Sequence, residues 1–295
     1  MMGVAAIEPH TGWSFSNAFD DDQFDQWQKL LEARTGMRFT RAQRSLLQTR
    51  LGQRMAEAGY EDYQAYYEHV TAGGMPAASE WQALIDYLTV QETRFFRDPM
   101  AMELVGEHLH ARWQRNTGPV QLWSVGCATG EEAYSLAMVA AEMNRKAKTP
   151  RPYAITGSDI SAPAIHKARL GRYHRRKLEP VPVSLQQRYF DWRGEEATVR
   201  RELAEHLCFT RLNVLDLEDA PMTGMDVIFC QNLLIYFRRW RRRDLVNELV
   251  SRLKPGGMLV LGPGELAGYD HPDLVPISSR NNLAWLRKYR TEHRE

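Results

Sequence analysis

The sequence predicts an α/β fold preceded by a small all-helical domain. Up to about Leu88 the apolar residues recur at helical spacing, with no alternating strand pattern. Beyond it, short apolar runs alternate with helical segments. Such alternation is typical of parallel strands joined by helical crossovers in an open sheet. We therefore expect a helical domain at residues 20–88 and an α/β domain at residues 89–295.

The helical domain is predicted from two groups of apolar residues and from the glycines between them. The groups are Phe24, Trp27, Leu30 and Leu31, followed by Tyr63, Tyr66, Tyr67 and Val70. Gly36, Gly59 and the stretch 73–76 separate the helical segments. This pattern predicts several short helices with a core of their own.

The α/β domain is predicted from its strand and helix candidates in chain order. The strand candidates are Val120–Val125, Tyr153–Ile160, Leu207–Asn213, Met225–Cys230, Gly257–Leu261 and Leu283–Leu286. The helix candidates are Glu131–Glu142, Ala162–Leu170 and Arg241–Leu253. The interval 171–205, rich in Arg, Pro and Glu, breaks the alternation and is predicted to be an inserted subdomain.

Composition excludes several classes of protein. With 43% hydrophobic residues and a net charge of +1, the chain resembles neither a disordered protein nor one whose whole surface binds nucleic acid. Cys127, Cys208 and Cys230 show no metal-ligand spacing and lie in apolar stretches, so we expect buried thiols and no metal. No signal peptide and no apolar run near the ~20 residues of a membrane span appear. We expect a cytoplasmic protein with no direct membrane insertion.

The strongest chemical signal is the first strand-to-helix junction, Leu122 to Glu132. It carries Gly126 and Gly130 followed by two acids, which differs from the GxGxxG pattern of dinucleotide sites. Glu131 and Glu132 would repel a pyrophosphate at the helix N-terminus. They suit a cofactor with a cationic amino-acid portion, such as S-adenosylmethionine (SAM). The alternative is that the acids only complement the helix dipole, above all Glu131.

Polar residues follow three further strands of the predicted sheet. Asp159 ends the second strand, where a carboxylate can accept both ribose hydroxyls of an adenosine. The alternative role for Asp159 is a helix cap, although Ser161 can supply that cap. Asn213 and the pair Gln231–Asn232 end later strands, and amides can recognise an adenine edge. Together these strand ends predict one cofactor site.

Four segments of the chain resemble one known family. They are residues 88–98, which contain Phe95-Phe96-Arg97-Asp98, and residues 130–135, 158–160 and 229–237. In this order they resemble the chemotaxis-receptor glutamate methyltransferases, the CheR family. The resemblance implies a Rossmann-like class I SAM methyltransferase sheet that methylates glutamate side chains on a receptor's signalling helices, leaving S-adenosylhomocysteine. In its length and in its departures from the family pattern, the chain is similar to the subgroup that serves type IV pilus (twitching) chemosensory systems, PilK.

The resemblance also implies which residues hold the cofactor. Carried over by position, they are Gln91, Thr93, Arg97, Glu132, Asp159, Asn213, Val214, Gln231 and Asn232. The family usually has Asn at the position of Gln91 and Arg at the position of Gln231. Gln for Asn lengthens an amide by one methylene, and Gln for Arg removes a charge. The resemblance further suggests that the insertion is a small β-subdomain, which in some members docks a peptide tether at the receptor's C-terminus.

Methyl transfer to a carboxylate predicts a site without a general base. A glutamate is already ionised at pH 7, so the enzyme has to align it with the methyl group. Arg97 is the candidate for binding a carboxylate of cofactor or substrate. Tyr236 is the candidate hydrogen-bond donor to the target oxygen, with a packed aromatic as the alternative.

Two basic stretches are candidates for contact with the substrate. The first contains Lys29, Arg34, Arg38, Arg41, Arg44, Arg50 and Arg54, with Glu32 as the acid among them. It suits docking to an acidic receptor helix bundle, or it is a solvated helix surface. The second, Arg238 to Arg243, follows Tyr236 and either binds substrate or begins a helix poorly matched to its dipole.

Two other functions stay open from the residues alone. The basic stretches and Trp240 would suit a nucleic-acid methyltransferase, although Gln231-Asn232-Leu233-Leu234 lacks the Asn/Asp-Pro-Pro-aromatic pattern common in that class. The departures at Gln91 and Gln231 would suit a catalytically idle SAM-binding scaffold. We expect the protein to be recruited to receptor arrays at the inner membrane through the receptor's signalling helices, and to bind no nucleic acid.

Overall fold

A computed structural model describes residues 19–115, 118–147, 149–265, 270–277 and 284–289 of the chain. Contacts between Cα atoms divide it into two compact units. The first consists of the described residues up to Leu30 together with Phe39–Leu88. The second consists of Leu31–Arg38 and the described residues from Thr89 onward. The end of the first helix thus belongs to the larger unit.

The first unit is built from helices. They are α1 (Asp21–Thr35), η1 (Arg41–Gln43), α2 (Arg44–Ala58), α3 (Tyr63–Thr71) and α4 (Gly74–Leu88). Its core is aromatic: Trp27 and Tyr66 are fully buried and stack with ring centroids 5.6 Å apart. Gly59 ends α2 in the left-handed conformation, and the Asp62 side chain accepts the Ala65 N–H to cap α3.

The second unit contains a sheet of seven strands. They are β1 (Val120–Val125), β2 (Tyr153–Asp159), β6 (Leu207–Arg211), β7 (Met225–Cys230), β8 (Leu253–Leu261), β9 (Leu274–Pro276) and β10 (Ala284–Arg287). Their order is β6-β2-β1-β7-β8-β10-β9. β1 pairs in parallel with both β2 and β7, so the order of connection reverses there. Ligands bind beyond the carboxyl end of such a central strand.

The sheet confirms the α/β class but is not wholly parallel. β10 runs antiparallel to both β8 and β9. The expectation of parallel strands is therefore wrong at this edge, and β9 was not predicted. Antiparallel neighbours need no helical crossover, so this edge lacks the strand-helix alternation on which the prediction rested.

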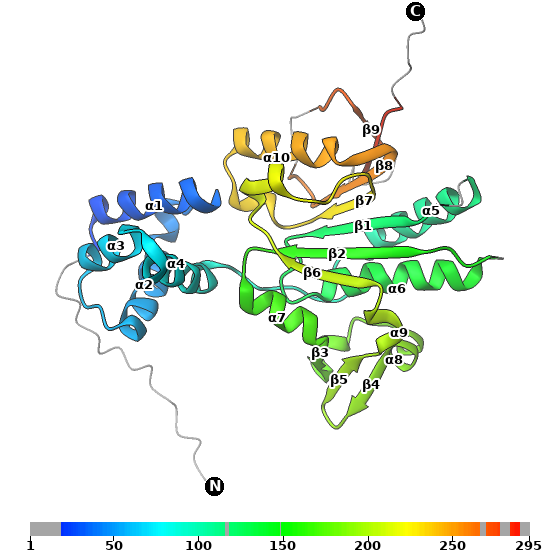
Figure 1. Cartoon of the computed structure of the whole chain (residues 1–295), viewed down its shortest axis with the longest axis horizontal. Coiled ribbons are helices and arrows are strands. Elements are labelled where there is room, and N and C mark those ends of the chain that lie inside the picture. The colour runs from blue at the N-terminus through cyan, green and yellow to red at the C-terminus, as the bar shows by residue number, and fades with distance from the viewer. Residues whose placement is uncertain (1–18, 116–117, 148, 266–269, 278–283, 290–295) are drawn as a thin grey trace, which may run out of the picture. The chain divides into compact units, whose positions relative to one another are not determined.

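Helices cover both faces of the sheet (Figure 1). They are α5 (Pro99–Arg115), α6 (Glu131–Lys146) and α7 (Ala162–Leu170) on one face, and α10 (Arg239–Ser251) with η3 (Val214–Asp219) on the other. Successive side chains of β1 point to opposite faces of the sheet and so enter two different cores. Leu122 packs in the core with α5 and α6, and Trp123 packs in the core with α10. Both β1 side chains are fully buried.

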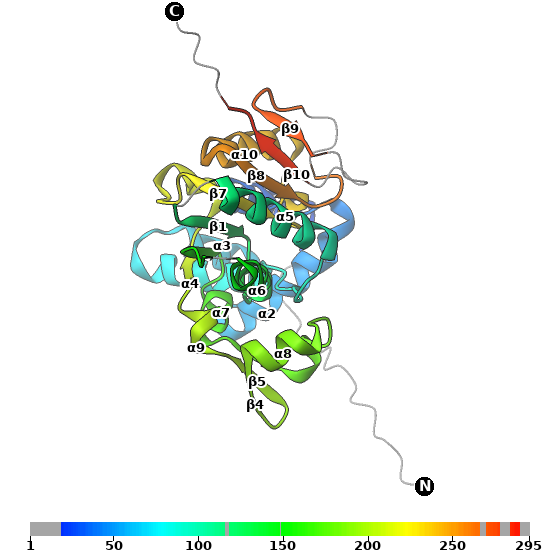
Figure 2. The same cartoon turned by 90° about the vertical axis from the view of Figure 1, so that its right-hand side faces the viewer.

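The interval after α7 forms a small antiparallel sheet, which Figure 2 shows beside α8 and α9. Its elements are β3 (Arg172–His174), η2 (Arg175–Leu178), α8 (Val183–Tyr189), β4 (Phe190–Arg193), β5 (Glu196–Val199) and α9 (Arg201–Ala204). The small sheet packs on the rest of the second unit through Phe190, whose ring contacts that of Phe95 edge-on, with ring centroids 5.7 Å apart. Tyr189 adds a 2.8 Å hydrogen bond to Glu142 of α6.

Of the three cysteines, Cys127 and Cys230 are buried as expected, whereas Cys208 is exposed. The expectation of a buried thiol is wrong for Cys208 because β6 is an edge strand and Cys208 lies on its exposed side. In the described part of the chain, no group of three or more His, Cys, Asp or Glu is arranged to hold a metal ion. No helix there combines the length and apolar character that a membrane span requires.

Candidate functional site

The loop between β1 and α6 lies at the point where the strand order reverses. Its backbone is tied to the end of β2, because the N–H groups of Gly126 and Cys127 both donate to the Ser158 carbonyl at 2.8 and 2.9 Å. Three of its residues, Gly126, Ala128 and Gly130, have positive φ angles of 74°, 46° and 95°. The loop therefore folds back tightly before α6 begins.

The two loop glycines make room for protein groups. A Cβ on Gly130 would lie 2.8 Å from the Ala168 Cβ and 3.0 Å from the Tyr173 hydroxyl. A Cβ on Gly126 would lie 3.3 Å from both Leu233 methyl groups. The two glycines therefore serve packing within the protein. Their missing side chains let α7 and the 231–237 segment approach the loop.

The two acids at the start of α6 have different environments. Glu131 is fully buried; its Oε2 accepts the Thr129 hydroxyl at 2.6 Å, and its Oε1 lies 3.1 Å from Lys177 Nζ. Glu132 is partly buried and accepts the Ser124 hydroxyl at 2.6 Å. Glu131 is thus neutralised inside the protein, and Glu132 is the acid available to a cation.

The Glu132 carboxyl carries a perturbed pKa. Burial raises its pKa to about 8, against the lowering effect of the Ser124 hydrogen bond. The charge of Glu265 raises the pKa further, and Arg97 lowers it. Near neutral pH this carboxyl therefore holds its proton readily, and a bound cation would favour its release.

Asp159 joins the ends of β1 and β2. Its Oδ2 accepts the Ala128 N–H at 2.9 Å, and its Oδ1 accepts the Ser161 N–H at 2.9 Å. Ser161 itself caps α7 by accepting the Ala164 N–H, as the sequence predicted. A carboxylate has about four acceptor positions, so Asp159 can still accept hydroxyls while it holds the loop.

Two amide side chains of the predicted site, those of Gln91 and Asn213, make internal hydrogen bonds. Gln91 donates to the Ser161 hydroxyl at 2.9 Å. Asn213 accepts the Leu215 N–H at 3.2 Å and donates to the Arg34 carbonyl at 2.9 Å. Their side chains thus fasten neighbouring segments at the strand ends. Val214, also predicted as a cofactor contact, is partly buried at the start of η3.

Gln231, which directly follows β7, is another amide of the predicted site. It is 7% exposed, and its side chain donates to Asp98 Oδ2 at 3.0 Å and to the Leu261 carbonyl at 3.3 Å. Asp98 in turn accepts the Ala101 N–H at the start of α5. Gln231 therefore joins the end of β7 to the Phe95–Asp98 segment without the charge of an arginine.

Backbone strain is concentrated at this site. The non-glycine residues with positive φ in the described part of the chain are Phe96, Ala128 and Asn232, at 48°, 46° and 61°. Each lies in one of the segments that the sequence singled out. Such conformations cost of order 1–3 kcal/mol and persist only where the surroundings hold them. The Phe96 N–H, for example, donates to the Ser135 hydroxyl at 2.9 Å.

An open cleft of about 450 Å³ lies beside these segments. It is lined by Gln91, Glu92, Thr93, Arg94, Arg97 and Lys177. Three lining residues are cations and one is an acid, so the cleft favours anionic groups. The inserted subdomain supplies Lys177, whose ammonium donates to the Thr93 carbonyl at 2.9 Å. Arg97 donates to the Glu92 carbonyl at 3.2 Å.

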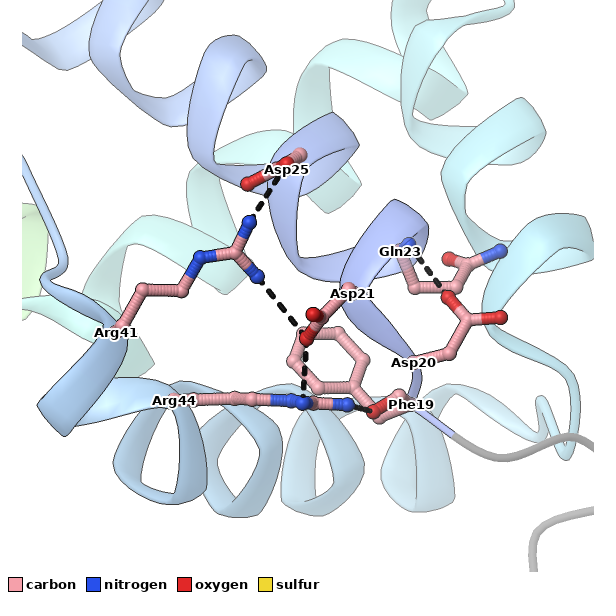
Figure 3. A network of polar contacts seen from close by, with 7 residues as sticks. All are labelled: Phe19, Asp20, Asp21, Gln23, Asp25, Arg41 and Arg44. Atoms are coloured by element: carbon pink, nitrogen blue, oxygen red, sulfur yellow. Dashed lines mark hydrogen bonds and ion pairs between the residues drawn. The ribbon is translucent and has the colours of Figure 1, made fainter.

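Four arginines of the first basic stretch are engaged within the first unit. Arg41 pairs with Asp21 and Asp25 at 3.0 and 2.8 Å, and Arg44 pairs with Asp21 at 2.6 Å and donates to the Phe19 carbonyl (Figure 3). Arg54 and Arg50 are also engaged: Arg54 pairs with Glu80, and Arg50 donates to the carbonyls of Tyr87 and Leu88. The basic stretch is thus partly structural, and its residues Lys29, Arg34 and Arg38 also lie at the surface.

Comparison with known proteins decides the family. The model of the CheR methyltransferase SAM binding domain matches residues 91–281, and that of the CheR methyltransferase all-alpha domain matches residues 22–89. The chain belongs to the CheR methyltransferase family. It is accordingly a SAM-dependent methyltransferase.

Relatives of this CheR methyltransferase come from several bacteria. The chemotaxis protein methyltransferases of Salmonella typhimurium and Escherichia coli are each 32% identical to it over 253 residues, covering 84% of this chain and 85% of the relative. A probable biofilm formation methyltransferase, WspC, of Pseudomonas putida is 30% identical over 262 residues, covering 88% of this chain and 60% of that protein.

The residues of this CheR chain fit SAM chemically. The cofactor has a cationic ammonium and sulfonium, and Glu132 and Asp159 place two carboxylates beside the loop that follows β1. Glu132 would hold the cationic part, and Asp159 would hold the ribose.

Sequence reasoning missed three residues of the site: Ser124, Lys177 and Glu265. Ser124 looks like an ordinary strand residue, and Lys177 lies in the insertion, far along the chain from its partner Glu131. Glu265 is 4% exposed and follows two glycines after β8. A single acid in a Gly-Pro-Gly-Glu turn was the one available signal.

Proposed function

We propose that this enzyme transfers a methyl group from SAM to glutamate side chains of a methyl-accepting, chemotaxis-type receptor. The observation that carries the proposal is the cationic cleft: Arg94, Arg97 and Lys177 line it beside the predicted cofactor loop. A carboxylate substrate would be attracted to such a cleft. Relatives that are chemotaxis protein methyltransferases support the same acceptor.

The reaction needs alignment rather than proton transfer. SAM supplies an electrophilic methyl group on a sulfonium. An ionised glutamate needs no general base, so positioning is the enzyme's main contribution, and good alignment can supply several kcal/mol. Arg97, whose guanidinium lines the cleft, is proposed to hold a carboxylate. Tyr236, partly buried at the end of η4 (Leu234–Tyr236), is proposed to donate to the target oxygen.

For the cofactor, we propose that Glu132 faces the ammonium and Asp159 the ribose. The remaining predicted contacts are Gln91, Thr93, Arg97, Asn213, Val214, Gln231 and Asn232. The side chains of Gln91, Asn213 and Gln231 already bond to protein groups. Contacts to the cofactor through their backbone would leave these hydrogen bonds intact. This would explain how the family's arginine can be replaced by Gln231.

We propose that the acidic signalling helices of the receptor dock by charge attraction. Support comes from Lys29, Arg34 and Arg38, which are exposed, and from the cationic cleft. Recruitment to receptor arrays at the inner membrane would follow from this partner. The helical domain, residues 20–88, is proposed to take part in docking, and the inserted subdomain, residues 171–205, is a further candidate for receptor contact.

The proposal is tested by identifying the bond that forms. The purified full chain is incubated with tritiated SAM and membranes containing the cell's receptors, and the labelled protein is then hydrolysed in alkali. Carboxyl methyl esters release volatile labelled methanol. Label that survives alkali would rule out a glutamate acceptor. The R97A variant serves as the matched control, and we expect it to lose most of the label.

The two other functions predict different results in the same assay. A nucleic-acid methyltransferase would label RNA or DNA and would bind it with an affinity that falls steeply with salt. A catalytically idle scaffold would bind SAM by calorimetry and label nothing. Either outcome would replace the glutamate proposal.

A narrower part of the proposal is that the enzyme methylates the receptor of a type IV pilus chemosensory system. What supports it is the pair of departures from the family pattern at Gln91 and Gln231. Deletion of the gene should then impair twitching over surfaces and leave flagellar swimming unchanged. Impaired swimming with normal twitching would assign the enzyme to a flagellar system.

A further inference from the structure

Glu265 is a buried carboxylate that binds backbone rather than a side-chain cation. It follows β8 in the turn Gly262-Pro263-Gly264-Glu265 and is 4% exposed. Its Oε2 accepts the Gly262 N–H at 2.6 Å, and its Oε1 accepts the Ile235 N–H at 3.3 Å. The backbone N–H groups of Asn232 and Leu234 also lower the pKa of this carboxyl, although burial raises that pKa overall.

Glu265 thus accepts backbone hydrogen bonds from two segments, its own turn and the segment after β7. A carboxylate that accepts several backbone N–H groups is stabilised in its charged form, which offsets part of the cost of burial. The close approach depends on Gly262, since a Cβ there would lie 2.6 Å from Glu265 Oε2. The local sequence is therefore shaped to hold an acid at this position.

The segment that Glu265 holds is the strained one after β7. Asn232 has φ of 61°, a conformation that a non-glycine residue keeps only when its surroundings enforce it. The same segment ends at Tyr236, whose N–H donates to the Leu233 carbonyl and whose carbonyl accepts the Arg38 N–H. Fixing the amides of Asn232, Leu234 and Ile235 therefore fixes the path of the chain toward Tyr236.

We propose that Glu265 is a positioning residue that holds the 231–237 segment at the site and adds a second negative charge that acts on Glu132. The inference deepens the proposed function, since Asn232 and Tyr236 are site residues there. It does not depend on which molecule accepts the methyl group.

The second charge has an electrostatic consequence. Glu265 raises the pKa of Glu132, while Arg97 and the Ser124 hydroxyl lower it. Cys127 and Cys230, two thiols on which one or both of these acids act, are buried, and burial raises their pKa so that both stay neutral; Glu131 and Asp159 are further acids that act on Cys127. Removing the Glu265 charge should let Glu132 ionise at lower pH. SAM binding, which favours ionised Glu132, should then reach its plateau at lower pH.

The test uses the full chain and the E265Q variant, which keeps the length of the side chain and removes its charge. Hydrogen exchange read by mass spectrometry or NMR should show the amides of Asn232, Leu234 and Ile235 exchanging about tenfold faster or more, with β7 and β8 unchanged. Calorimetric titration with SAM across pH 6 to 9 should show the affinity rise shifted to lower pH.

Two matched variants complete the design. E248Q changes an exposed acid on α10 and should alter neither measurement. If E265Q does not fold, E265D keeps the charge but is one methylene shorter, and it should raise the same exchange rates. Unchanged exchange at residues 232–235, or an unmoved pH profile in E265Q, would overturn the proposal. Neither readout requires the methyl acceptor, so a failed glutamate assay would leave this result standing.

Discussion

Lys177 Nζ lies 3.1 Å from Oε1 of Glu131, and the Glu131 side chain is 1% exposed. The lysine comes from the inserted subdomain, and the glutamate begins the helix after the cofactor loop. The same ammonium donates to the Thr93 carbonyl. One cation therefore joins the insertion, the cofactor loop and the segment that carries Arg97. The acid at this helix start has a partner that a dipole argument alone does not supply.

Replacing this lysine should destabilise the second unit. K177M leaves the buried Glu131 charge with only the Thr129 hydroxyl, and an unpaired buried polar group costs about 1–3 kcal/mol. Urea denaturation should show that loss in the free energy of unfolding. K167M, at an exposed lysine of α7, is the control and should be neutral within about 0.5 kcal/mol. The double variant E131Q/K177M should recover part of the loss, and a loss equal to that of K177M would contradict the pairing.

SAM binding near pH 7 should release a proton from Glu132. Its pKa of about 8 keeps the carboxyl largely protonated in the free enzyme, and a bound cation favours the carboxylate. Titration calorimetry in phosphate and in Tris, whose ionisation enthalpies differ, measures the protons released. Wild-type enzyme should release a fraction of a proton at pH 7, and E132Q should release none. Equal release from both proteins would place the proton on another group.

The same raised pKa predicts how stability depends on pH. Because the folded-state pKa of Glu132 exceeds its ordinary 4.5, its contribution to stability is present below pH 4.5 and is lost as pH rises through about 8. E132Q cannot ionise, so its melting temperature relative to wild type should rise between pH 5 and pH 9. A difference that stays constant over that range would show that Glu132 titrates normally.

Removing the Asp159 carboxylate should abolish measurable SAM binding. D159A loses the proposed ribose acceptor and also releases the Ala128 and Ser161 N–H groups that shape the loop. D159N keeps one acceptor oxygen and should bind SAM with intermediate affinity. D191A, which removes an exposed carboxylate of the subdomain paired with Arg200, should bind like wild type. Undiminished affinity in D159A would remove Asp159 from the cofactor site.

Gly130 should tolerate no side chain. In G130A the new Cβ would lie 2.8 Å from the Ala168 Cβ, and the alanine would have to adopt φ of 95°. Overpacking and left-handed backbone together should cost about 2 kcal/mol or more of folding free energy. G194A is a matched control, because Gly194 has φ of 60° with nothing within 4 Å of the added Cβ. It should show only the backbone cost, about 1 kcal/mol. Equal losses would mean that the contact with α7 is unimportant.

Local pattern was enough to determine the class of fold and much of its central sheet. The ranges predicted for β1, β7 and α7 are those observed, because apolar runs and helical periodicity are properties of consecutive residues. The Gly126–Glu132 loop and Asp159 could be placed side by side because the ends of adjacent parallel strands meet at one sheet edge. The cofactor, too, follows from this loop and from the resemblance.

Only the tertiary structure decided which polar groups pair. Glu265 accepts the Ile235 N–H from 30 residues upstream, Glu131 pairs with Lys177 of the insertion, and Gln231 bonds to Asp98 at a separation of 133 residues. It also showed that Arg41 and Arg44 of the basic stretch are bound to acids of α1. No spacing rule connects residues this far apart, because their proximity is set by how whole elements pack. Burial then fixes the protonation and partners of each group, and burial is a property of the folded chain alone.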